Sequence, residues 1–246
     1  MKTGLIGAMQ EEILLLKDEL TELNEIRIGC RHYYLGNIGN HEIVMCLSGW
    51  GKVAAASAAT TLINEFQVNQ LVFIGLAGSL HSGLNIGDIV VADSLVQHDV
   101  DLTRLDNFPQ VHPPFWKSFR FKIGPDQLNF ALQAVNQFVG DLNRGYYPEI
   151  SPLYHPEVVV GTIGTGDQFV ASEWGKKLIR EKYPDVLCTE MEGAAVAQVA
   201  ADYELPCSVI RIISDKADSD AHQAFADFLD QNISKISVAI AKLLFR

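Results

Sequence analysis

Short apolar runs alternate along this chain with longer segments in which apolar residues recur at a helical period. The expected strands are residues 3–6, 33–37, 42–47, 70–74, 88–96, 158–163, 186–189 and 208–213. The expected helices are residues 11–20, 52–65, 126–138, 173–182, 193–203 and 223–244. This alternation predicts an α/β fold in which helices cover a mostly parallel sheet. A length of 246 residues favours a single domain over residues 1–246.

Four runs are apolar nearly throughout, so they are expected in the centre of the sheet with both faces buried: residues 3–6, 72–75, 186–189 and 209–213. Residues 33–47 instead predict a hairpin, with Gly36, Gly39 and Asn40 near its turn. Two long connections are expected, one over residues 104–120 and one between Tyr146 and Pro156. The first is rich in proline and aromatic residues, and it could cover a pocket, contact a second subunit or pack over its own domain.

The charge balance narrows the choice of partners. Nineteen Lys and Arg against thirty Asp and Glu give a net charge of −11, which repels phosphate backbones and anionic lipid. Nucleic acid and membrane are therefore not expected as partners, and neither a signal-peptide pattern nor a membrane-spanning run is found. Four scattered cysteines without a CxxC pair indicate reduced, buried thiols and a cytoplasmic protein: Cys30, Cys46, Cys188 and Cys207.

Carboxylates follow several of the apolar runs. In a parallel sheet, ligands bind beyond the carboxyl ends of the strands, where Glu12, Glu192 and Asp215 are expected. Two of these acids also have ordinary explanations, because Glu12 could be a first-turn acid of a helix and Asp215 a helix cap or ion-pair partner. A buried carboxylate without a partner is costly, however, so three of them at one edge favour a site.

Other motifs exclude some chemistries. The glycine-rich stretches 75–79 and 164–166 allow a ligand to approach the backbone, but they lack the patterns that bind NAD or nucleoside triphosphates. Phe169 and Phe225 could stack on a flat heterocycle or pack in the core. His98 has no second histidine at metal-ligand spacing, so a structural role is expected and no metal site is predicted. No serine lies in the GxSxG pattern of serine hydrolases.

Several short motifs follow one another along the chain: Gly7-Ala8-Met9 with Glu11-Glu12, Ser48-Gly49, Gly51 to Ala55, Gly75 to Leu80, Gly87 to Val91, Gly166 to Phe169, Glu190 to Gly193 and Ile213-Ser214-Asp215. Taken together and in this order, they resemble those of the bacterial 5'-methylthioadenosine/S-adenosylhomocysteine nucleosidases. The resemblance covers essentially the whole chain. It implies a three-layer α/β/α nucleoside phosphorylase-like fold with a central mixed sheet, a homodimer, and hydrolysis of the N-glycosidic bond of adenosine thioethers without a cofactor.

The resemblance also implies roles for single residues. Asp215 would be the general acid toward N7 of adenine, Glu12 the base that activates water, and Glu192 the carboxylate on the ribose hydroxyls. The apolar run before Asp215 is expected to raise its pKa, as a general acid near neutrality requires. The remaining implied contacts are Met191 to the ribose, Arg211 to the catalytic water and ribose, Ser214 to Asp215, Phe169 and the Val170 backbone to adenine, Ala77 and Gly78 to the substrate, and Met9, Trp50 and Phe225 to the thioribosyl side.

The chain departs from the family pattern at three places. Leu76 stands where many members carry a serine that contacts the nucleophilic water. Near the 5'-substituent, Trp50 replaces a smaller aliphatic residue, and Leu105 replaces a phenylalanine expected from a partner subunit. The segment between Tyr146 and Pro156 is longer than usual. These departures leave the preferred 5'-group open.

Three alternatives therefore remain at this point. A phosphorylase of the same fold would need cations at an anion site, which the loops with Glu11, Glu12 and Leu76 do not supply. A hydrolase of aminodeoxyfutalosine, whose 5'-substituent is bulky and aromatic, would use the same catalytic residues, and Trp50 favours it slightly. A catalytically silent nucleoside-binding protein would have no need for Glu12, Glu192 and Asp215 together.

Overall fold

The computed structural model describes residues 1–101, 120–150, 155–225 and 233–246. Its strands are β1 (Lys2–Gly7), β2 (Thr21–Ile28), β3 (Arg31–Ile38), β4 (His41–Leu47), β5 (Gln70–Ser79), β6 (Ile89–Gln97), β7 (Arg120–Lys122), β8 (Val158–Thr165), β9 (Val186–Glu190) and β10 (Cys207–Asp215). Its helices are α1 (Gln10–Asp18), α2 (Lys52–Phe66), α3 (Pro125–Asn143), α4 (Glu173–Lys182), α5 (Gly193–Asp202) and α7 (Ile233–Leu244).

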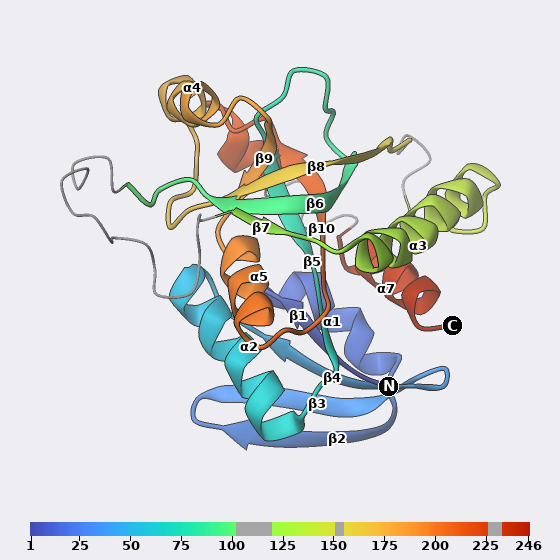
Figure 1. The fold of residues 1–246 in the computed structure, drawn as a ribbon. Helices are drawn as coiled ribbons and strands as arrows, with labels where there is room; N and C mark the ends of the chain where they lie inside the picture. Colours follow the sequence, from blue (N-terminus) through green and yellow to red (C-terminus); the bar gives the residue numbers. More distant parts are fainter. Residues whose placement is uncertain (102–119, 151–154, 226–232) are drawn as a thin grey trace.

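Helices cover both faces of one mixed sheet (Figure 1). Helices α2 and α5 pack together on one face, where alanines of both helices meet the sheet in an apolar core. Helices α1, α3 and α7 pack on the other face over a second core that contains Leu16, Phe138 and Ile240. The three-layer α/β/α fold with a central mixed sheet is therefore confirmed.

Strand β5 is the centre of the sheet. It pairs in parallel with β1 and β10, and its last residues pair antiparallel with β9, Gly78 lying opposite Thr189. Strand β6 runs antiparallel to β10 and parallel to β8, and β8 runs parallel to β9. The strand pairings therefore form a closed circle, in the order β5, β10, β6, β8, β9 and back to β5. The carboxyl end of β9 lies beside those of β5 and β10.

All eight expected strands are present, and the four apolar runs lie in β1, β5, β9 and β10, each with a neighbour on both sides. The expected hairpin is formed by β3 and β4, with Gly39 at a φ of 57° in the turn. Strands β2 and β7 were not expected. Every residue of β2 is exposed at the sheet edge, so its sequence carries no alternation of buried and exposed positions. Strand β7 has only three residues.

Some expectations concern residues outside the described ranges, and others need correction. The connection 104–120, including Leu105, lies outside the described residues except for Arg120, and so do residues 151–154 and 226–232. Within the expected helix 223–244, α7 covers Ile233–Leu244. The expectation of four buried thiols is wrong for Cys30, which is exposed in the tight connection between β2 and β3, whereas the other three are buried. Among the described residues, no helix combines the length and apolar composition needed to cross a membrane.

Candidate active site

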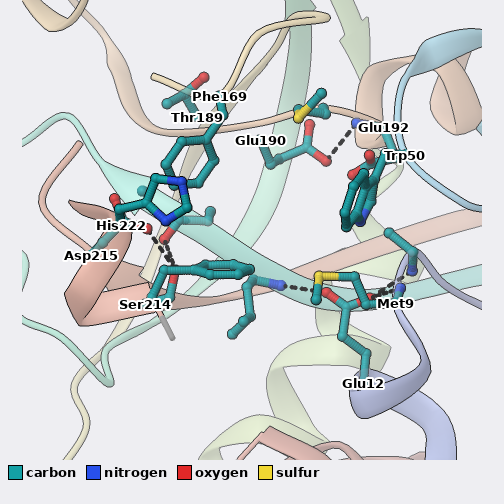
Figure 2. A pocket seen from close by; sticks show the side chains of 16 residues that line it. Met9, Glu12, Trp50, Phe169, Thr189, Glu190, Glu192, Ser214, Asp215 and His222 are labelled. Atoms are coloured by element: carbon teal, nitrogen blue, oxygen red, sulfur yellow. Dashed lines mark hydrogen bonds between the residues drawn. The ribbon is translucent and has the colours of Figure 1, made fainter. Parts of the chain in front are cut away.

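A cavity of about 420 Å³ opens where the carboxyl ends of β1, β5, β9 and β10 meet. Figure 2 shows acidic, aromatic and sulfur-containing side chains turned toward the same space. Its lining residues are Ala8, Met9, Glu12, Trp50, Leu76, Ala77, Gly78, Phe169, Thr189, Glu190, Met191, Glu192, Ser214, Asp215, His222 and Phe225.

Glu12 lies buried in the first turn of α1, and backbone amides hold both oxygens of its carboxylate. Oε2 accepts hydrogen bonds from the amides of Ala8 and Met9 at 2.6 and 3.0 Å, and Oε1 accepts one from the amide of Leu76 at 3.1 Å. A Cβ atom at Gly75 would lie 2.8 Å from Oε1, so this position needs glycine. Burial raises the pKa of Glu12, while Arg211 and the three amides oppose the rise. The result is a fixed carboxylate of increased basicity.

Asp215 ends β10 and is also buried. Its Oδ1 accepts a hydrogen bond from the amide of Ala217 at 2.8 Å, and its Oδ2 lies 2.7 Å from Oγ of Ser214. The same hydroxyl lies 3.3 Å from the carbonyl oxygen of Ala77. One hydroxyl has a single hydrogen, so Ser214 donates to one of these two oxygens at a time. Burial raises the pKa of Asp215, while the hydrogen bonds from Ser214 and from the amide of Ala217 oppose the rise.

Glu192 precedes α5, and its Oε1 accepts a hydrogen bond from the amide of Gly51 at 2.8 Å. Its pKa is raised to about 8, first by burial and then by the nearby charge of Glu190. Figure 2 shows Glu192 on the side of the cavity where Trp50 lies. A carboxylate in this position can accept hydrogen bonds from vicinal hydroxyls of a ligand.

Glu190 and Arg211 form a buried ion pair behind this wall. Oε2 of Glu190 lies 2.6 Å from Nη2 and 3.2 Å from Nε of Arg211, whose guanidinium stacks 4.0 Å from the ring centre of Phe73. Oε2 of Glu190 also accepts hydrogen bonds from the amides at the start of α5, and Oε1 accepts one from Thr165. Burial alone would lower the pKa of Arg211, but Glu190 and Glu12 hold it above its ordinary value.

Aromatic side chains line the remaining part of the cavity. The ring of Phe169 is 45% exposed and meets the ring of Phe225 edge to face at 5.7 Å. The ring of His222 lies 5.6 Å from that of Phe169. Trp50 leaves 71% of its surface exposed, although it contributes to the lining. These rings can receive a flat heterocycle or another planar group.

A family model described as the phosphorylase superfamily matches residues 2–244. The chain belongs to the phosphorylase superfamily. The 5'-methylthioadenosine/S-adenosylhomocysteine nucleosidase of Staphylococcus aureus (strain JH9) is 31% identical over 98% of both chains. The Neisseria meningitidis nucleosidase of the same name, solved with methylthio-immucillin-A, is 32% identical with a TM-score of 0.85, covering 99% of this chain and 97% of its own. A futalosine hydrolase of Helicobacter pylori strain 26695 is also 32% identical, with a TM-score of 0.83 and coverage of 99% and 97%.

Most residues expected in this phosphorylase-superfamily site lie together on the cavity lining: Met9, Glu12, Trp50, Ala77, Gly78, Phe169, Met191, Glu192, Ser214, Asp215 and Phe225. Val170 lies beside them, lining a smaller adjoining pocket with Phe169 and Asp215. Arg211 was expected to contact the substrate, but it does not line the cavity, because its guanidinium is bound to Glu190 and to the carbonyl oxygen of Ile210.

Sequence reasoning gave no role to Glu190, Thr189 or His222, although all three line the cavity. The sequence did contain a signal for a role of Glu190 in the site, since this residue ends an apolar strand two residues before Glu192. His222 had none, because an exposed polar residue in a helical segment is ordinary. His98, expected to be structural, places Nε2 3.2 Å from Oγ1 of Thr189, and burial lowers its pKa. The described residues contain no group of three side chains arranged to hold a metal ion.

Proposed function

We propose that this protein hydrolyses the N-glycosidic bond of 5'-methylthioadenosine and S-adenosylhomocysteine and releases adenine. One observation carries the proposal: a single cavity holds both Asp215, in surroundings that favour its acid form, and Glu12, fixed by three amides. Cleavage between a purine and a ribose needs a proton for the leaving base and a base that activates water. The relatives from Staphylococcus aureus and Neisseria meningitidis are named as nucleosidases of the same two substrates.

The two carboxyls divide the reaction between them. Asp215 donates its proton to N7 of adenine while the bond from C1' to N9 breaks and its electron pair moves to the base. A water molecule adds to C1' of the developing oxocarbenium ion, and Glu12 takes a proton from that water. The products are adenine and the free thioribose. Burial raises the pKa of both groups, which shifts their proton transfer toward higher pH than that of an exposed carboxyl.

The remaining lining residues fit the two halves of such a substrate. Glu192 and Met191 would contact the ribose, Phe169 would stack on adenine, and the Val170 backbone would bind its edge. Ser214 would orient Asp215, and Ala77 and Gly78 would let the ligand approach β5 closely. Met9 and Phe225 would line the thioribosyl side, and Arg211 would act through Glu190.

Hydrolysis is favoured over phosphorolysis because the described part of the cavity lining offers no cationic side chain to a phosphate. Among the described residues around the cavity there is no lysine or arginine, whereas Glu12, Glu190, Glu192 and Asp215 all line it. A phosphate nucleophile would need cations or free amides at this place. The amides nearest the reacting end are already bound to Glu12.

The test is adenine release from 5'-methylthioadenosine and S-adenosylhomocysteine, with and without phosphate, with the sugar product identified. Hydrolysis predicts equal rates in both buffers and free thioribose as the product. Strict phosphate dependence with a sugar 1-phosphate would instead identify a phosphorylase. No adenine release from either thioether would overturn the proposal.

A second candidate function is hydrolysis of aminodeoxyfutalosine, and Trp50 is the observation that favours it. The exposed indole beside the cavity provides a stacking surface for an aromatic 5'-substituent. The futalosine hydrolase of Helicobacter pylori is as similar to this chain as the nucleosidase of Neisseria meningitidis. Aminodeoxyfutalosine is therefore the third substrate of the assay, and a kcat/KM above that of both thioethers would make it the main function.

A homodimer in the cytoplasm completes the proposal. The dimer is supported by the resemblance to the nucleosidases, and the connection over residues 104–120, which could contact a second subunit, lies outside the described residues except for Arg120. The cytoplasmic location is supported by four cysteines that form no disulfide among themselves. Light scattering at working concentration should give twice the 27.1 kDa chain mass; a monomeric mass would contradict the dimer.

A further inference from the structure

Three charged residues outside the cavity lining join three loops near its mouth. We call Lys52, Asp99 and Asp167 the loop-linking cluster. Lys52 begins α2, Asp99 follows β6, and Asp167 follows β8. Nζ of Lys52 lies 2.5 Å from Oδ1 of Asp99 and 3.8 Å from Oδ2 of Asp167, and the amide of Asp167 donates to Oδ2 of Asp99 at 2.9 Å. The cluster therefore connects segments that are far apart in sequence.

The cluster also caps a helix that has no cap of its own. Gly51 is the N-cap residue of α2, and the first turn of α2 contains no acidic residue. Oδ1 of Asp167 accepts a hydrogen bond from the amide of Lys52 at 2.8 Å, so a carboxylate 115 residues away satisfies this helix end. A Cβ atom at Gly51 would lie 3.0 Å from that oxygen, and its φ of 89° suits glycine.

The loop-linking cluster is connected to the active site through Gly51, the residue before α2. The amide of Gly51, one peptide before that of Lys52, is the donor to Oε1 of Glu192. Trp50, one residue earlier, lines the cavity. A shift of the loop would move the hydrogen-bond donor of Glu192 and the indole together.

We propose that Lys52, Asp99 and Asp167 are positioning residues that hold the β4–α2 loop so that Gly51 orients Glu192 and Trp50 faces the ligand. The cluster is a network rather than a single exposed pair, and Lys52 is largely shielded from solvent, so its charges are screened less than those of isolated surface pairs. The role assigned to Glu192 rests on the proposed function; the control of the loop does not.

The first test needs no turnover. Hydrogen exchange of residues 48–58 is compared in the ligand-free wild type, Lys52→Met and Asp99→Asn. Lys177→Met is the matched control, because Lys177 forms an exposed pair with Glu181 on α4. Loss of the cluster should make exchange in this segment roughly 3- to 10-fold faster, with no change in the control. Unchanged exchange in both cluster variants would overturn the proposal.

The second test separates positioning from a general loss of structure. Contacts to the ribose are made in both the ground state and the transition state, so Lys52→Met should raise KM for 5'-methylthioadenosine roughly 3- to 10-fold while kcat changes less than about 2-fold. Lys52→Arg keeps the cation and should restore KM. A fall in kcat that equals or exceeds the rise in KM would contradict this role. If the wild type releases no adenine, the proposed function fails, while the exchange experiment still decides whether the cluster holds the loop.

Discussion

The carboxylate of Glu190 and the guanidinium of Arg211 lie 2.6 Å apart, and both side chains are almost completely removed from solvent. Glu190 faces the cavity, whereas Arg211 lies behind it over the ring of Phe73. The pair therefore connects the floor of the site to the core of the sheet. Arg211 also supplies the positive charge that opposes the rise in the pKa of Glu12.

Glu190→Gln should strongly destabilise the fold. The substitution keeps an amide oxygen as acceptor but removes the ion-pair partner of the buried Arg211, and breaking a buried pair in this way typically costs about 3–5 kcal/mol. Denaturant unfolding at neutral pH measures the change in the free energy of unfolding. Glu173→Gln is the control, because Glu173 is exposed and its loss should cost less than about 0.5 kcal/mol. Equal effects of the two substitutions would show that the ion pair contributes nothing.

Asp215→Asn should remove the proton donor while keeping the shape of the side chain. General acid catalysis typically contributes 10²- to 10⁴-fold, so kcat for adenine release should fall by roughly that factor. Binding of adenine, measured by calorimetry, should change much less, which separates catalysis from folding. Asp220→Asn, a substitution at an exposed position in the following segment, should leave kcat unchanged. Full turnover in Asp215→Asn would remove this residue from the mechanism.

Glu12 and Asp215 could be located from sequence because each follows a buried apolar run, and the ends of such runs meet at one edge of the sheet. Their hydrogen bonds could not be predicted. Glu12 is held by Leu76, 64 residues away, and Glu192 by Gly51, 141 residues away. These contacts depend on how the strands close around β5, which no local pattern records.

Arg211 shows the same limit from the opposite direction. The resemblance implied a contact to the catalytic water and ribose, but it gave no sign that the guanidinium pairs with Glu190, 21 residues away. The edge strand β2 was missed because both of its faces are exposed, whereas the buried strands have the strongest apolar signal. Sequence thus predicted the buried framework better than the exposed edge or the direction of buried polar side chains.

The pKa of Glu192 predicts a pH dependence of stability. An ordinary value of 4.5 in the unfolded chain and about 8 in the folded protein mean that the folded state binds more protons between these values. The free energy of unfolding should therefore fall as the pH rises through this window, with a slope of at most about 1.4 kcal/mol per pH unit from this group. In Glu192→Gln this contribution is absent, so the variant should gain stability relative to wild type between pH 5 and pH 8.5. A constant difference in Tm across this range would contradict the raised pKa.

Cysteine reactivity should follow burial. Cys30 is exposed, whereas burial raises the pKa of Cys46 and of Cys207 to about 12 and raises that of Cys188 as well. Ellman's reagent should thus react quickly with one thiol in the native protein and with four after unfolding. Cys30→Ser should abolish the fast phase. A fast phase that persists in this variant would mean that a buried thiol becomes accessible through local opening.

Trp50 should determine which 5'-substituent the site prefers. Its indole lines the cavity and stays largely exposed, so it can stack on an aromatic group but gains little from a methylthio group. Trp50→Ile should lower kcat/KM for aminodeoxyfutalosine by roughly 2- to 10-fold, as expected for loss of one aromatic contact. The kcat/KM for 5'-methylthioadenosine should change less than 2-fold, so the two substrates serve as controls for each other in the same variant. If the substitution instead improves turnover of S-adenosylhomocysteine most, the indole acts as an obstacle to a long tail, and the stacking role is wrong.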